Sequence, residues 1–157
     1  AAQNGHTECT SLLLTAKATV DHNINAGASP LCITCQNGHT EVVRQLLVAK
    51  ATVNHCANDN ISPLFLSCQF GHTEVVGLLI DAKANVNLVR TDNGFSPLRA
   101  ACYCGHAEIA GMLVDAGASI TVAYGVSAID QARHSGHADV VKVLLERIKL
   151  NESSTNQ

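Results

Sequence analysis

Histidine and cysteine are the residues in this sequence with the greatest potential for catalysis or metal binding. The segment His6-Thr7-Glu8, followed by Pro30 and Cys32-Ile33-Thr34-Cys35, partly resembles the His-x-Glu and Pro-Cys-x-x-Cys signature of zinc deaminases. However, Leu31 interrupts the second half of that signature. A His-x-acid pattern also recurs along the chain, so we interpret it as part of a scaffold and predict no catalytic residue and no enzyme.

Three of the seven cysteines share one sequence register. They are Cys35, Cys68 and Cys102, and the segment Cys102-x-Cys104-x-His106 adds further side chains that zinc can use. A row of three thiols is still one ligand short of the four that structural zinc normally requires. We therefore predict that these cysteines are small core side chains, and we expect no bound metal and no cofactor.

The dipeptide Gly-His exposes an internal repeat. It begins at Gly5, Gly38, Gly71, Gly105 and Gly136, so the intervals are 33, 33, 34 and 31 residues. In each copy an acidic residue stands two positions after the histidine. Five copies in one register predict a single repetitive domain, because repeats of this length fold as stacked units.

Each copy also carries signals for two helices. Ser-Pro-Leu begins nine residues before Gly-His at Ser29, Ser62 and Ser96, and the last copy has the weaker Ser127-Ala128-Ile129. A serine hydroxyl can cap a helix, and proline fits the first helical turn, where its missing N–H costs nothing. After the histidine, apolar residues such as those of 42–47 recur at helical spacing, which predicts a second helix.

This pattern resembles the ankyrin repeat family, whose motif runs roughly G-x-T-P-L-H-x-A-A-x-x-G-H-x-E-V-V-x-L-L-L-x-x-G-A-x-V-N. Residues 94–101 (GFSPLRAA) and 42–47 (VVRQLL) are close copies of it. The resemblance implies an all-α solenoid of stacked antiparallel helix pairs with projecting β-hairpin-like fingers. We predict one domain over 1–150, with repeats at about 1–24 (partial), 25–56, 57–89, 90–121 and 122–150, the last a C-terminal cap, and a polar tail over 151–157.

Several positions depart from the family motif. The histidine of Thr-Pro-Leu-His is replaced by Cys32, Phe65, Arg99 and Asp130, which predicts looser coupling between repeats. Lysine stands at positions 17, 50 and 83, where the family prefers glycine, and a left-handed backbone there would cost about 1 kcal/mol each. The 31-residue interval predicts a shortened last finger near 121–123. The first copy lacks Ser-Pro-Leu, so we expect an array that is cut or continues upstream.

The bulk composition narrows the function classes. The net charge is −3, which argues against nucleic acid as the partner, and the sequence contains no apolar run of membrane-spanning length. Seven cysteines, an odd number, favour free thiols over a secreted disulfide framework. We therefore expect a monomeric, intracellular protein of the cytoplasm, with the nucleus as the alternative, that does not act on a membrane.

Aromatic residues are rare, at 3% of the chain, and most of them fall where ankyrin repeats contact their partners. Phe65 stands at the position of the family's histidine. For Phe65 and Phe70 the alternative interpretation is that their rings simply pack between repeats. Aromatic anchors surrounded by polar groups are typical of protein-binding surfaces. We predict that a partner protein or peptide binds the stripe Ile61, Phe70, Phe95, Tyr103 and Tyr124, with the polar rim Asp59, Gln69, Arg90, Asp92, Asn93, Arg99 and His134.

Two alternatives to partner binding stay open at this point. The chain could be a structural spacer in a larger ankyrin-containing protein whose active domain lies elsewhere. Residues 79–87 also resemble the context in which ankyrin-repeat asparagines are hydroxylated by an oxygenase, with Asn87 as the target.

Overall fold

The structure is a computed structural model, and it describes residues 1–23, 27–120 and 127–155 of the 157. The described chain is a succession of helix pairs, in which a first helix is followed by a second. The pairs are η1 (Ala2–Asn4) with α1 (Thr7–Thr15), α2 (Pro30–Asn37) with α3 (Thr40–Val48), α4 (Pro63–Phe70) with α5 (Thr73–Asp81), α6 (Pro97–Cys104) with α7 (Ala107–Asp115), and α8 (Ala128–His134) with α9 (Ala138–Thr155).

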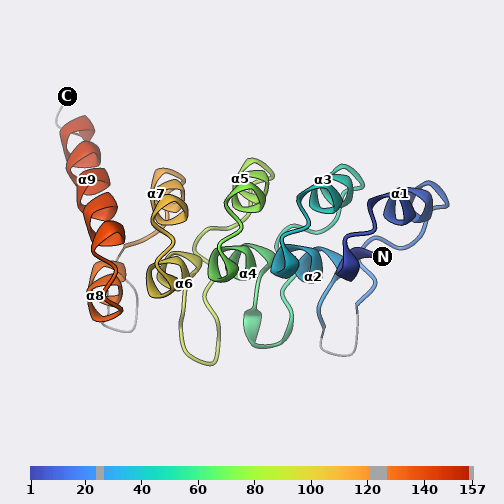
Figure 1. The fold of residues 1–157 in the computed structure, drawn as a ribbon, viewed down its shortest axis with the longest axis horizontal. Helices are drawn as coiled ribbons and strands as arrows, with labels where there is room; N and C mark the ends of the chain where they lie inside the picture. The colour runs from blue at the N-terminus through green and yellow to red at the C-terminus, as the bar shows by residue number, and fades with distance from the viewer. Residues whose placement is uncertain (24–26, 121–126, 156–157) are drawn as a thin grey trace.

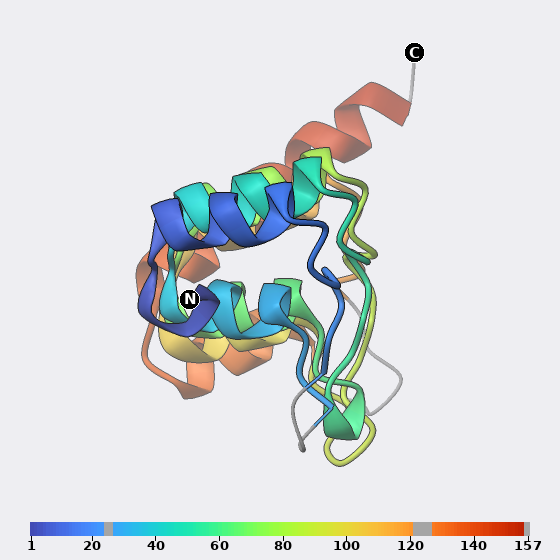
Figure 2. The ribbon, with the colours of Figure 1, turned by 90° about the vertical axis from the view of Figure 1, so that its right-hand side faces the viewer.

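The helix pairs stack side by side into an elongated solenoid with two helical layers. The first helices α2, α4, α6 and α8 form one layer and the second helices form the other (Figure 1). Extended segments such as 49–62 and 82–96 project away from the helices as fingers (Figure 2), and the short 3-10 helix η2 (Asn58–Asn60) lies in one of them. The described residues include no β-strand, only an isolated bridge between Ala57 and Ile61. The predicted all-α solenoid is therefore confirmed.

Serine caps begin the first helices as the sequence predicts. The hydroxyls of Ser62 and Ser96 accept hydrogen bonds from the backbone N–H groups of Phe65 and Arg99, each at 3.1 Å. Ser29 and Ser127 cap α2 and α8 in the same way. Each cap satisfies a backbone donor that the first turn of a helix leaves without a partner.

The Gly-His dipeptides form contacts that link neighbouring helix pairs. Nε2 of His39, His72, His106 and His137 lies 3.0, 3.0, 3.3 and 3.1 Å from a backbone carbonyl oxygen of the preceding pair. The ring also packs on the glycine of that pair. A Cβ atom at Gly71, for example, would lie 2.6 Å from Cε1 of His106. The histidines therefore bond the preceding repeat and do not cap their own helices, which lack a side-chain cap.

The core runs continuously through the stack between the two helical layers. Equivalent positions in successive pairs are buried, such as Leu31, Leu64 and Leu98 in the first helices and Leu46, Leu79, Leu113 and Leu144 in the second. Cys35, Cys68 and Cys102 are fully buried in the same core, at 0% exposure. Their predicted role as small core side chains fits this placement.

Several details of the chain depart from the family motif or from our expectations. Lys17, Lys50 and Lys83 have left-handed backbones, with φ of 59°, 65° and 64°. Helix α9 continues through Thr155, so residues 151–155 of the predicted polar tail are its last turns. The predicted short finger near 121–123 lies outside the described residues. Within the described chain no helix has both the length and the apolar character required to cross a membrane.

Candidate protein-binding surface

A cavity of about 150 Å³ lies where α4, α6 and the finger 82–96 meet. We call it the aromatic groove. Helix α4 and helix α6 each contribute aromatic and small or polar side chains, and the finger adds an arginine, an asparagine and a phenylalanine. The lining residues are Phe65, Gln69, Arg90, Asn93, Phe95, Ala100, Tyr103 and Cys104.

Ring contacts hold the aromatic side chains of the groove in place. Phe95 and Tyr103 pack edge to face, with ring centroids 6.2 Å apart. The guanidinium carbon of Arg99 lies 4.2 Å from the centroid of the Phe95 ring, and that of Arg90 lies 5.4 Å from the centroid of Phe65. Such cation–π contacts fix the arginine side chains over the rings. The groove is therefore preorganised in the absence of a partner.

The finger 82–96 presents its groove residues through a tight local turn. The backbone N–H of Arg90 donates to the carbonyl of Phe95 at 3.0 Å, and the N–H of Gly94 donates to the carbonyl of Arg90 at 3.0 Å. The Asn93 side chain accepts from the N–H of Phe95 at 3.0 Å. The preceding finger supports this turn, because Asp59 accepts from the N–H of Thr91 through its backbone carbonyl at 3.0 Å.

The groove unites about half of the residues predicted for partner binding. Arg99 stacks on Phe95 at its edge, and five predicted residues line it: Gln69, Arg90, Asn93, Phe95 and Tyr103. Tyr103 is 56% exposed, although aromatic side chains are costly to leave in water. The groove therefore carries a largely exposed aromatic ring.

Other predicted residues lie outside the groove lining. Phe70 is 48% exposed and stacks on His72, with ring centroids 6.5 Å apart. Ile61 is half-buried and forms the isolated bridge with Ala57. The carboxylate of Asp92 binds the guanidinium of Arg90, with Nε at 2.9 Å. Tyr124 lies outside the described residues.

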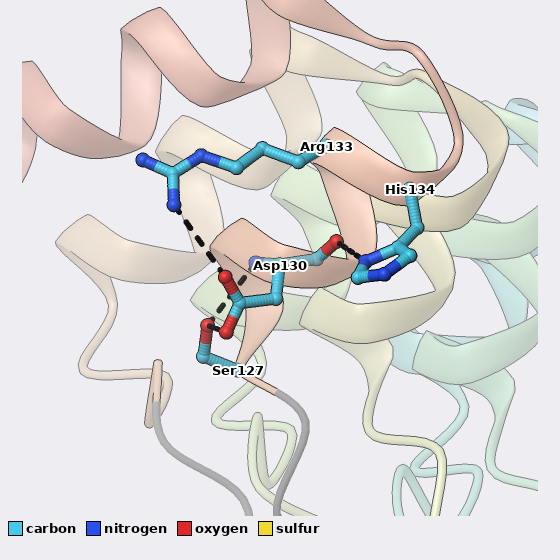
Figure 3. Close-up of polar contacts among 4 residues, drawn as sticks. All are labelled: Ser127, Asp130, Arg133 and His134. Atoms are coloured by element: carbon cyan, nitrogen blue, oxygen red, sulfur yellow. Dashed lines mark hydrogen bonds and ion pairs between the residues drawn. The ribbon is translucent and has the colours of Figure 1, made fainter.

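His134 lies on α8, beyond the groove, in a small polar network (Figure 3). Its Nδ1 lies 2.7 Å from the carbonyl oxygen of Asp130. The Asp130 carboxylate accepts from the hydroxyl of Ser127 at 2.7 Å and pairs with Arg133 at 3.5 Å. In Figure 3 Arg133 and His134 extend to opposite sides of Asp130, so only Arg133 reaches its carboxylate.

The structure assigns Phe65 a role that the sequence left open. Phe65 is only 3% exposed, as in the packing alternative, yet its ring lines the groove and lies under Arg90. Cys104 and Ala100 also line the groove and were absent from the predicted stripe. Cys104 follows Tyr103 directly in the variable pair before Gly-His, and this position is the sequence feature that could have predicted Cys104 at the groove.

The position of Asn87 bears on the predicted hydroxylation. Its Oδ1 accepts from the backbone N–H of Ser119 at 2.8 Å, and its Nδ2 donates to the carbonyl of Gly117 at 3.2 Å. The exposed side chain thus ties the finger 82–96 to the end of the next helix pair. An oxygenase would have to reach an amide that already makes two hydrogen bonds.

Burial affects the ionisation of the cysteines in the core. Burial raises the pKa of Cys102 to about 12 and the pKa of Cys35 and Cys68 well above the ordinary value of 9.0. These thiols are therefore protonated at neutral pH, whereas the thiolate is the nucleophile and metal ligand. Among the described residues no three His, Cys, Asp or Glu side chains are grouped so that they could hold a metal ion.

Comparison with protein families agrees with the repeat geometry. A family model described as ankyrin repeats in three copies matches residues 1–90, 33–124 and 88–155. The chain belongs to the ankyrin repeat family. Ankyrin repeats are in general protein–protein interaction modules. A comparison with curated proteins found no match to this ankyrin repeat chain.

Proposed function

We propose that this ankyrin repeat domain binds a partner protein or peptide through the aromatic groove and the adjacent finger tips, without catalysis. The observation that supports this proposal best is the exposed ring of Tyr103 beside the cavity, packed against Phe95. Aromatic side chains at the centre of a contact surface commonly supply much of the binding free energy. Gln69, Asn93 and Arg99 are placed to form the polar rim around it.

The remaining residues of the predicted stripe extend the proposed surface. Ile61 belongs to the finger 49–62, and Phe70 lies at the end of α4. Asp92 adds a polar group on the finger 82–96, and His134 adds one on α8. Tyr124 is kept as a predicted contact of the last finger. We further propose that the domain is monomeric and intracellular, which is consistent with its seven free cysteines, and that its partner is not nucleic acid.

An affinity pull-down with two groove variants tests this proposal. Tyr103→Glu and Phe95→Glu place a charge in the groove, and we expect each to weaken partner binding at least about 30-fold, as for an interface hot spot. Val48→Glu is the matched control, because Val48 is 77% exposed on α3 and does not line the groove. Thermal unfolding of all three proteins checks that each one folds.

Loss of the same partners from both groove variants, with retention by Val48→Glu, would support the assignment. Recovery of the same partners by all variants would show that the surface is wrong. If the chain instead serves as a structural spacer, none of the variants should lose a directly bound partner in the pull-down. Hydroxylation of Asn87 is a separate prediction, tested by mass spectrometry for one added oxygen on the Asn87 peptide from cells that contain the oxygenase.

A further inference from the structure

We propose that the aromatic groove recognises an acidic peptide segment, in which one apolar side chain fills the cavity and a neighbouring carboxylate binds Arg99. The proposal rests on the function assigned to the groove above and adds the chemistry of the partner. It follows from the size of the cavity, the rings that line it and the state of the arginine at its edge.

The cavity has room for one apolar side chain. Its volume is about 150 Å³, and an engineered cavity of about that volume in another protein accepts benzene. Phe65, Phe95 and Tyr103 contribute apolar rings to its lining, and Ala100 contributes a small apolar side chain. A leucine, methionine or phenylalanine of a partner would therefore replace water against these rings.

Arg99 is the charge at the groove that no internal carboxylate neutralises. Its Nε donates to the amide oxygen of Gln131 at 3.1 Å, and within the described residues no Asp or Glu carboxylate pairs with it. Stacking on Phe95 orients the plane of the guanidinium, and in the part of the chain that the structure describes its Nη atoms donate no hydrogen bond. This is the geometry that favours binding of a carboxylate from a partner.

Two acidic residues near Arg99 in the repeat structure, one on the finger 82–96 and one on α8, are engaged by other partners. Asp92 binds Arg90, so this pair contributes no net charge to the groove. Asp130 occupies the position in α8 that is equivalent to Arg99, but its carboxylate contacts Ser127 and Arg133 (Figure 3). Arg99 is therefore left with neutral Gln131 as its hydrogen-bond acceptor among the described residues.

The wider charge distribution also favours an acidic segment at the groove. The recurrent acidic residues Glu41, Glu74 and Glu108 are in the first turns of the second helices. The first helices α2, α4 and α6 contain no acidic residue. Although the chain carries a net charge of −3, the layer that forms the groove presents Arg99 without acidic neighbours on its own helix.

The test is selection from a displayed library of short random peptides on the wild-type domain and on Arg99→Gln. We expect wild-type selections to enrich peptides with Asp or Glu next to a large apolar residue. Synthetic copies of these peptides should bind Arg99→Gln about tenfold more weakly, since a charge-assisted hydrogen bond is lost. Arg44→Gln is the control, because it removes the same charge from α3 and should leave the affinity unchanged.

The outcomes separate this inference from the proposed function. Peptides that need Tyr103 but show no acidic preference, or that bind Arg99→Gln as well as wild type, would overturn the inference and leave the groove assignment standing. Peptides that bind equally well to Tyr103→Glu, or no enriched peptide at all, would overturn both. Because Arg99 also contacts Gln131, Arg99→Lys is measured too, and its retained charge should preserve part of the acidic preference.

Discussion

Three lysines show how single residues set the local backbone energy of this stack. Lys17, Lys50 and Lys83 each follow a second helix with φ near 60°, where a side chain is strained. At the equivalent position after α7, Gly117 has φ of 87° and no such strain. The conformation is imposed by helix termination, since the lysine N–H bonds back into the helix, as that of Lys83 does to Ile80.

Replacing Lys83 by glycine should therefore stabilise the domain. We expect Lys83→Gly to raise the free energy of unfolding by about 0.5–1 kcal/mol, measured by urea unfolding, because the left-handed strain is removed. The control is Lys142→Gly within α9, where glycine should lower the stability by about 1 kcal/mol. A loss of stability in Lys83→Gly would show that the lysine side chain makes contacts whose stabilisation exceeds the backbone strain.

The groove was only partly predictable at the level of residues. The sequence register predicted Phe95 and Tyr103 at outward positions, because those positions follow the repeat period; Tyr103 is exposed, whereas Phe95 is partly buried. It could not show that Arg99 stacks on Phe95 or that Arg90 covers Phe65. These contacts depend on the turn of the finger around Asn93, and the repeat period carries no information about that turn.

At the scale of elements, the serine caps define where the first helices begin. Ser62 is 1% exposed, and its hydroxyl accepts a hydrogen bond from the N–H of Phe65. If this hydroxyl were removed, water could not easily take its place as the acceptor. The Ser-Pro-Leu pattern predicted these starts to the residue at α2, α4 and α6. The sequence did not predict that α9 continues to Thr155, because its polar composition after Lys149 lacks an apolar face.

Removal of one cap should weaken α4 measurably. We expect Ser62→Ala to lower the free energy of unfolding by about 1–2 kcal/mol in urea unfolding, since the donor at Phe65 loses its partner. Ser11→Ala in the exposed part of α1 is the control, with an expected change within about 0.5 kcal/mol. Equal changes in both variants would contradict the capping role.

The contact between glycine and histidine is the second element-level feature that a mutation can isolate. Gly71 and Gly136 both have φ of 78°, but a Cβ would meet the His106 ring at Gly71 and nothing within 4 Å at Gly136. We expect Gly136→Ala to cost about 1 kcal/mol through backbone strain alone, and Gly71→Ala to cost at least about 1 kcal/mol more. Both values come from urea unfolding, and equal losses would show that the ring simply moves aside.

At the scale of the whole molecule, buried thiols from three neighbouring helix pairs share one core. Cys35, Cys68 and Cys102 are each at 0% exposure, and burial raises the pKa of all three. For Cys102 the folded pKa is about 12, compared with 9.0 as the ordinary value. Below pH 9 the thiols keep their protons in both the folded and the unfolded chain, so their burial contributes its full stability there. Above it the unfolded chain ionises first, and stability is lost.

The domain should therefore lose stability as the pH rises from about 9 towards 12, by up to about 1.4 kcal/mol per pH unit for each buried thiol. We expect Cys102→Ala to reduce the dependence of the free energy of unfolding on pH by the contribution of one thiol, measured by urea unfolding under reducing conditions. Cys9→Ala should keep the wild-type slope, because Cys9 is exposed. An unchanged slope in Cys102→Ala would mean that other groups cause the alkaline loss.

The histidine contacts also have a consequence for how such a chain can grow. Each histidine ring bonds a carbonyl oxygen of the preceding helix pair and covers the glycine of that pair. Every interface between neighbouring pairs therefore uses the same contact between a glycine and a histidine. A tandem duplication of residues 40–72 would create one new boundary, between His72 and Thr40, with the same glycine and histidine in the two copies. A chain lengthened in this way would keep one copy of α4 next to α6, so the groove between these helices would be retained.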